Sequence, residues 1–217
     1  FKSAALHSSY PYRIFRSGDG DYIYPILPTY GTHHSKTIKI MFTGIIESQA
    51  QVLEIIKTDR NLTFWLQCPF IKELKTDQSL AHNGVCLTVE AIENHRYAVT
   101  AIEETLRKTH LADWQVGQNI NIERAMPASG RFDGHMVQGH VDGVGICTNI
   151  KNLQGSWEFV FRYKPTEQSI VIEKGSVCIN GVSLTVVKCS EESIHVHIIP
   201  YTYEPVSYTH LTLPTKA

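Results

Sequence analysis

Apolar and polar residues alternate in short runs over most of the chain after residue 40. In segment 85–89, Val, Cys, Leu, Thr and Val follow one another, so the thiol and the hydroxyl share one face of a strand. Segment 182–186 repeats this alternation with Ser183 in place of Cys86. Asn-Gly precedes both segments, and these residue types tolerate the positive φ of a tight hairpin turn. The pattern therefore predicts two β-hairpins of one kind.

Other short segments have the β-branched, aromatic and alternating composition of strands. They are residues 50–56, 62–68, 96–102, 119–124, 158–163, 170–179 and 193–199. Many short strands separated by turns favour an all-β barrel or sandwich. For units of about 90 residues we expect closed barrels, because closure leaves no exposed strand edge.

An internal repeat organises these strands. The sequence NGVCLTV at 83–89 returns as NGVSLTV at 180–186, with an offset of 97 positions. At the same offset, AIEET at 101–105 aligns with IIPYT at 198–202. The repeat predicts two homologous halves.

Further upstream the offset is 95, because GIIE at 44–47 aligns with GHVD at 139–142. The segment PASGRFDG at 127–134 is rich in small and turn-forming residues and is typical of a junction. The predicted division is an extension over 1–40, a first barrel over 41–133, a second barrel over 134–205 and a tail over 206–217.

Composition is that of an ordinary soluble protein, with 42% hydrophobic and 19% charged residues. A formal net charge of -1 provides no basic surface and so argues against nucleic-acid binding. No apolar run is long enough to span a membrane. The five cysteines include no C-x-x-C pair, which favours reduced thiols in a cytoplasmic protein over a disulfide framework.

Four sequence motifs carry a resemblance to a known family. They are MFTGIIE at 41–47, HNGVCLTV at 82–89, SGRFDGHMVQGHVDGVG at 129–145 and INGVSLTV at 179–186. In this order, together with the repeat, they resemble the riboflavin synthases of the two-barrel, lumazine-binding type. The resemblance extends from Met41 to about Glu204.

The resemblance implies two Greek-key barrels, a C-terminal helix and a homotrimer, with each active site between barrels of neighbouring subunits. It implies a transferase that converts two molecules of 6,7-dimethyl-8-ribityllumazine into riboflavin and a ribitylamino-pyrimidinedione, in the last step of riboflavin biosynthesis. It implies no metal and no organic cofactor, and it makes lumazine synthase a candidate partner. Two related pockets suit a reaction between two copies of one molecule.

The resemblance also implies the residues of the site. Candidate catalytic residues are Ser183, His140 and Cys86. Candidate substrate-binding residues are Gly44, Ile45, Ile46, Cys86, Leu87, Thr88, Thr100, Ala101, Ile102, Glu103, Glu104, Thr105, Gly139, His140, Val141, Lys174, Ser183, Leu184, Thr185, His197, Ile198, Ile199, Pro200, Tyr201 and Thr202. Ser183 and His140 are expected within one ligand's reach of each other.

Each assignment has an alternative. Hydroxyls that alternate with Val and Leu also occur on solvated strand faces, and a cysteine or histidine also serves as a structural residue. His33 with His34, or His195 and His197 with Cys189, are conceivable metal ligands. The whole chain could be a non-catalytic lumazine- or flavin-binding protein, or a small barrel that binds oligonucleotides. Intact hydroxyls in both repeats favour the enzyme.

The C-terminal part departs from the repeat. At the offset of 97, the counterpart of 119–124 falls at about 216–221, and all but the first two of these positions lie past Ala217. The sequence VSYTHLTLPTKA at 206–217 continues no pattern, and we interpret it as a tail foreign to the family. We therefore expect an incomplete second barrel, a monomeric or aggregated chain and little synthase activity. Residues 1–40 are expected to form a loosely ordered extension.

Overall fold

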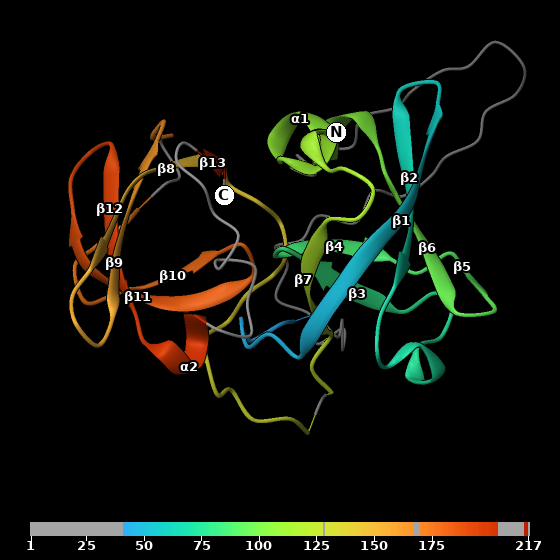
Figure 1. Cartoon of the computed structure of the whole chain (residues 1–217), viewed down its shortest axis with the longest axis horizontal. Coiled ribbons are helices and arrows are strands. Elements are labelled where there is room, and N and C mark those ends of the chain that lie inside the picture. Colours follow the sequence, from blue (N-terminus) through green and yellow to red (C-terminus); the bar gives the residue numbers. More distant parts are fainter. Residues whose placement is uncertain (1–40, 128, 167–169, 204–214, 217) are drawn as a thin grey trace, which may run out of the picture. The chain divides into compact units, whose positions relative to one another are not determined.

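Figure 1 shows the computed structural model of the chain, which describes residues 41–127, 129–166, 170–203 and 215–216. The predictions made for residues 1–40, and for 206–214 and 217, fall outside the described residues. No helix in the described ranges is long and apolar enough to cross a membrane.

Seven antiparallel strands form the first half (blue to green in Figure 1). They are β1 (Ser48–Thr58), β2 (Asn61–Gln67), β3 (Ser79–His82), β4 (Val85–Thr88), β5 (Ala91–Glu93), β6 (Arg96–Ala101) and β7 (Asn119–Arg124). Their order in the sheet is β4-β3-β7-β1-β2-β6-β5. One helix, α1 (Glu103–Lys108), follows β6, and two short 3₁₀ helices lie at Ile71–Glu73 and Leu111–Asp113.

This sheet closes on itself. Its two edge strands, β4 and β5, are consecutive in the chain and are separated only by Val89 and Glu90. The Glu90 N–H donates to the Ala98 carbonyl of β6, and the Val89 N–H donates to the Gln78 carbonyl just before β3. The same extended stretch therefore pairs on both sides, and the predicted barrel is confirmed for the first half.

The second half (yellow to red in Figure 1) repeats this plan. Its elements are β8 (Gly145–Asn152), β9 (Trp157–Tyr163), β10 (Ser176–Ile179), β11 (Val182–Cys189), β12 (Ser193–Ile198), α2 (Pro200–Tyr203) and β13 (Thr215–Lys216). The sheet order is β10-β11-β12-β9-β8-β13. Here β11 is one continuous strand that pairs with β10 and then with β12, as β4 and β5 together pair in the first half.

The offset of 97 is visible in the elements themselves. β3 and β10, and likewise β6 and β12, begin and end at positions related by this offset, and α1 and α2 begin at related positions. One strand prediction is wrong in part. Segment 170–179 forms a strand only over Ser176–Ile179, because the stretch before it contains a turn at Glu173 and Lys174, where Lys174 has φ of 65°.

Candidate functional site

The two Asn-Gly turns form as predicted. Asn83 and Gly84 have φ of 47° and 83°, and Asn180 and Gly181 have 49° and 81°. Positive φ at both central residues is the type I′ geometry of two-residue hairpins. The turns lie against each other, since a Cβ built on Gly181 would be 2.8 Å from the Gly84 nitrogen. The two repeats therefore meet at their turns, where a side chain has no room.

The central strand of each half is hydrogen-bonded to the segment that precedes the barrel of the other half. The Ser183 N–H donates to the Gly44 carbonyl at 2.8 Å, and the Cys86 N–H donates to the Gly139 carbonyl at 2.9 Å. Both glycines have φ of 76°, and a Cβ on them would lie 2.8 Å from Ser183 Cβ and 2.6 Å from Cys86 Cβ. Gly44 precedes the first barrel and Gly139 the second. The segments that lead into the barrels are therefore exchanged.

We call residues 42–46 and 137–141 the lead segments. Phe42 and Val137 form a two-bond bridge between them, with N–H to carbonyl distances of 2.7 and 3.0 Å. Ile46 packs against the core of the second half, and Val141 packs against the core of the first half. Ile46 and Val141 are candidate binding residues from the sequence, but no sequence pattern indicated that the lead segments are exchanged.

Ser183 faces a histidine that the sequence analysis did not select. The Ser183 Oγ lies 2.7 Å from the Nδ1 of His135, and both residues are half-buried. Burial lowers the pKa of His135, so its imidazole is neutral at neutral pH. A neutral imidazole can accept the hydroxyl proton of the serine. The only sequence signal for His135 was its place in the same motif as His140.

His140 lies elsewhere in the site. It is exposed, and it follows Gly139, whose backbone contacts Cys86 rather than Ser183. In the described residues no hydrogen bond joins His140 to Ser183. His140 instead lines a cavity of about 480 Å³. Other residues in the wall of this cavity are His110, His135, Gly139, Val141 and Asn180.

The two central strands have the expected alternation. Val85 and Leu87, like Val182 and Leu184, are buried in the barrel cores, whereas Thr88 and Thr185 are exposed. Cys86 and Ser183 are half-buried on the same faces as the threonines.

Burial raises the pKa of the Cys86 thiol, and a hydrogen bond with Ser79 opposes that rise. A thiol with a raised pKa is protonated at neutral pH and is a poor nucleophile. This thiol therefore fits a residue that lines a pocket better than one that attacks a substrate.

The strand ends at 100–105 and 198–202 occupy equivalent places, where β6 and β12 lead into α1 and α2. Ala101 and Ile198 are buried, Thr105 and Thr202 are half-buried, and Ile102 and Ile199 are both exposed. In the first half the Thr100 Oγ1 donates to Glu90 at 2.8 Å. Exposed isoleucines at matched positions provide an apolar surface beside each strand end.

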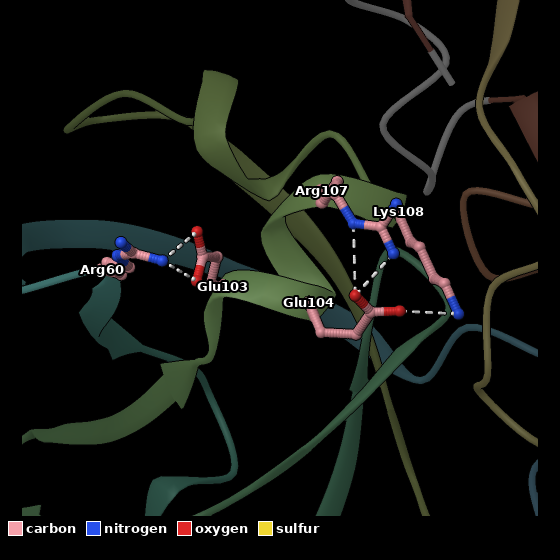
Figure 2. A network of polar contacts seen from close by, with 5 residues as sticks. All are labelled: Arg60, Glu103, Glu104, Arg107 and Lys108. Carbon is pink, nitrogen blue, oxygen red and sulfur yellow. Dashed lines mark hydrogen bonds and ion pairs between the residues drawn. The ribbon is translucent and has the colours of Figure 1, made fainter.

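Figure 2 shows the ion pairs at the first strand end, which have no counterpart at the matched positions of the second. Glu103 pairs with Arg60 at 3.1 Å, and Glu104 pairs with Arg107 and Lys108 at 2.6 and 2.9 Å. The hydrogen bond from Arg107 lowers the pKa of Glu104. The corresponding positions of the second half hold Pro200 and an exposed Tyr201, with no charge.

The remaining candidates are Ile45, Lys174 and His197. Ile45 and Lys174 are exposed. The His195 Nδ1 lies 3.3 Å from the Glu158 Oε1, with the His197 Nε2 at 3.9 Å from the same oxygen. Within the described parts of the chain, no three His, Cys, Asp or Glu residues are placed to hold a metal ion. The alternative of a zinc site at His195, His197 and Cys189 therefore has no structural support.

The fold and the paired motifs define an all-β protein with two homologous halves that contact each other through their Asn-Gly turns and lead segments. A family profile described as the lumazine binding domain matches residues 43–125 and 138–216, and the chain belongs to this family. The second match includes β13, which pairs with Cys147 and Ile146 of β8.

Curated relatives and solved structures agree with this assignment. Riboflavin synthase from Actinobacillus pleuropneumoniae is 37% identical over 163 residues, which cover 75% of this chain and 76% of that protein. Riboflavin synthase from Bacillus subtilis (strain 168) is 33% identical over 177 residues, with 81% and 82% covered. The crystal structure of LumP complexed with 6,7-dimethyl-8-(1'-D-ribityl) lumazine has a TM-score of 0.73 at 18% identity and covers 81% of this chain and 96% of its own. At that identity the similarity establishes the fold.

Proposed function

We propose that the chain is a riboflavin synthase. It transfers a four-carbon unit between two molecules of 6,7-dimethyl-8-ribityllumazine and releases riboflavin and 5-amino-6-ribitylamino-pyrimidinedione. The observation that carries the proposal is the pair of motifs, each completed by the lead segment of the other half. Relatives that are 37% and 33% identical to this chain over the aligned residues are riboflavin synthases.

Two related pockets suit this reaction because donor and acceptor are the same compound. Each barrel holds one flat ring and its polyol chain, beside the hydroxyls and backbone groups of its central strand. Binding both molecules in one assembly converts a bimolecular encounter into an intramolecular one. The total atoms of the two substrates equal those of the two products, so no oxidant or reductant is consumed.

Ser183 and His135 provide the proton-transfer pair on one side. The reaction needs a proton removed from the methyl group at C7 of one ring, and a nucleophile at C7 of the other. The neutral imidazole of His135, 2.7 Å from the Ser183 hydroxyl, can accept a proton through that hydroxyl. On the other side the half-buried Cys86 thiol stays protonated and serves as a passive contact, and the exposed His140 follows Gly139, which contacts Cys86.

The proposal extends to the assembly of the chain, which is a homotrimer. In a homotrimer, the first half of one subunit would face the second half of its neighbour, and the two substrates would stack between them. The resemblance supports this arrangement, a cytoplasmic location and lumazine synthase as a partner. Sizing chromatography and light scattering test the trimer directly.

The test of the activity incubates the chain with 6,7-dimethyl-8-ribityllumazine alone and follows flavin fluorescence at high protein concentration. Riboflavin synthase from Bacillus subtilis, assayed in parallel, is the positive control. We expect riboflavin from both proteins. If the chain binds the lumazine but forms no riboflavin while the control does, the chain is a lumazine-binding protein instead.

Variants of the two central strands sharpen this test. Ser183→Ala should lower the rate more than Cys86→Ser, because loss of one hydrogen bond costs about 0.5–1.5 kcal/mol and more when its partner becomes charged. Cys86→Ser changes the volume little and keeps a donor. Equal losses in steady-state rate would assign Cys86 an active role.

A further inference from the structure

Glu123 of β7 is a buried carboxylate within the first barrel. It is 5% exposed, and its position in the sheet is fixed by pairing with Ala81 of β3. Burying a carboxylate is costly unless its oxygens accept hydrogen bonds. Its three recorded donors all belong to Thr43 and Gly44 in the first lead segment.

The two carboxylate oxygens divide these donors between them. Oε1 accepts from the Thr43 N–H at 2.6 Å and from the Thr43 hydroxyl at 2.8 Å, and Oε2 accepts from the Gly44 N–H at 3.0 Å. Charge-assisted hydrogen bonds of this kind are stronger than neutral ones and fix geometry. The carboxylate therefore determines where the backbone of residues 43–44 lies.

The carbonyl groups of the same two residues point the other way, toward the second motif. The Thr43 carbonyl accepts from the His135 N–H at 3.0 Å. The Gly44 carbonyl accepts from the Ser183 N–H at 2.8 Å. Glu123 is thus connected through two peptide units to both members of the Ser183–His135 pair, whose side chains are 2.7 Å apart.

We propose that Glu123, although it belongs to the first barrel, is the positioning residue for the Ser183–His135 pair at the lumazine site of the second barrel. This inference rests on the proposed function. It assigns no contact between Glu123 and substrate. The carboxylate sets the distance and angle between hydroxyl and imidazole by holding Thr43 and Gly44, whose carbonyls accept from the backbone N–H groups of His135 and Ser183.

Glu123→Gln is the sharpest variant. An amide keeps one acceptor oxygen for Thr43 but turns an NH₂ group toward the Gly44 N–H, which now faces a donor. Gly44 must move, and Ser183 moves with it. Glu192→Gln is the control, because Glu192 is an exposed carboxylate paired with Arg162 far along the sequence from this network.

Two measurements test the proposal on the complete chain. The first is the NMR signal of the His135 imidazole without ligand, which should shift in Glu123→Gln and stay unchanged in Glu192→Gln. The second is a fluorescence titration with 6,7-dimethyl-8-ribityllumazine. We expect two sites in the wild type, and in Glu123→Gln one unchanged site and one weakened about tenfold, as loss of a hydrogen bond to a charged group predicts.

The pH dependence of lumazine binding provides a further check. Burial raises the pKa of Glu123 above its usual range, against the effect of its hydrogen bonds from Thr43 and Gly44. Glu47 adds to the rise, and Cys178 is the other titratable group that senses this charge. Protonation of the carboxyl removes an acceptor, so the second site should weaken as pH falls through this raised pKa. Titration of His135 itself persists in Glu123→Gln, which separates the two effects.

The results distinguish the two proposals. If the wild type binds no lumazine, the proposed function fails, while the ligand-free NMR signal still tests Glu123. If Glu123→Gln leaves the His135 signal and both affinities unchanged, the positioning role is wrong. Equal weakening of both sites with a lower melting temperature would also overturn it, because that is the result of a general loss of fold.

Discussion

Asp77 in the first half and Lys174 in the second hold the same turn with opposite charges. Both have φ of 65°, and their N–H groups donate to the Val89 and Val186 carbonyls at 2.9 and 2.8 Å. The backbone of the repeat is therefore kept while its side chains differ. Cys86 and Ser183 differ in the same way on the two central strands. One backbone plan thus presents different side chains in its two copies.

The cores of the two halves differ as well. His82 and Tyr97 are fully buried in the first half, and the His82 Nε2 lies 3.0 Å from the Tyr97 hydroxyl. The matched positions of the second half hold Ile179 and Ile194, both in its apolar core. A hydrogen-bonded polar pair and an apolar pair fill the same place in the two barrels. The halves should therefore respond differently to pH.

The largest expected effect is at the two glycines that approach the opposite half. Gly44→Ala and Gly139→Ala each place a methyl group within 2.8 Å of a partner Cβ, at φ of 76°. Positive φ costs an alanine about 1–2 kcal/mol, and overpacking adds about 1–3 kcal/mol. We expect each variant to lose about 2–5 kcal/mol in denaturant unfolding.

Gly117→Ala is the matched control, because Gly117 has φ of 89° and open space around the added Cβ. It should show the conformational cost alone. Lumazine titration then separates the two glycines, since Gly44→Ala should affect the Ser183 side and Gly139→Ala the Cys86 side. A loss at the reverse sides would contradict the exchange of the lead segments.

The next effect concerns acid stability and the His82–Tyr97 pair. Burial lowers the pKa of His82 from 6.5 to about 4. Between these values the unfolded chain binds the proton and the folded chain does not. The contribution of neutral His82 to the free energy of unfolding is therefore complete above pH 6.5 and is lost as pH falls toward 4. A shift of this size corresponds to about 3 kcal/mol.

The double variant His82→Leu with Tyr97→Phe should remove this dependence. It replaces the polar pair by apolar groups of similar shape and leaves neither member of the pair unsatisfied, while the Leu80 carbonyl loses its contact with the His82 Nδ1. Melting temperatures measured from pH 7 to pH 4 should fall less steeply than in the wild type. Because the pKa of Glu123 is raised, this residue makes stability change with pH in the opposite direction. It does so equally in the wild type and in the double variant, so its effect cancels when the two melting curves are compared. Parallel curves would show that His82 is not the acid-sensitive group.

The sequence predicted what the repeat encodes locally. The hairpin turns, the alternation around Cys86 and Ser183 and the two halves are confirmed, because residue type and spacing determine them. The strand over 170–179 is partly wrong, because its β-branched residues precede a turn at Lys174. Propensity alone does not distinguish a strand from an extended loop.

The exchange of lead segments and the contact of His135 with Ser183 were not predicted. Both depend on contacts between residues far apart in sequence, such as Gly44 with Ser183 and His135 with Ser183. No local periodicity reports such a contact. The three donors on Glu123 come from residues about 80 positions away, so its role also required the folded chain.

The smallest effect concerns the first residues of the two turns. Asn83 and Asn180 have nearly equal φ of 47° and 49°, so an alanine pays the same conformational cost at either position. The Asn83 Oδ1 accepts from the Asn121 N–H at 2.9 Å, whereas the buried Asn180 Oδ1 has no hydrogen-bond partner within the described residues. Losing a buried partner costs about 1–3 kcal/mol. Asn83→Ala should therefore destabilise the chain more than Asn180→Ala, by about 1–2 kcal/mol.

Asn94→Ala, at φ of 52° on an exposed turn, reports the conformational cost alone. Urea unfolding of the three variants gives the comparison. Equal losses at Asn83 and Asn180 would mean that a donor reaches the Asn180 Oδ1 in solution, and the two halves would then be alike at their turns.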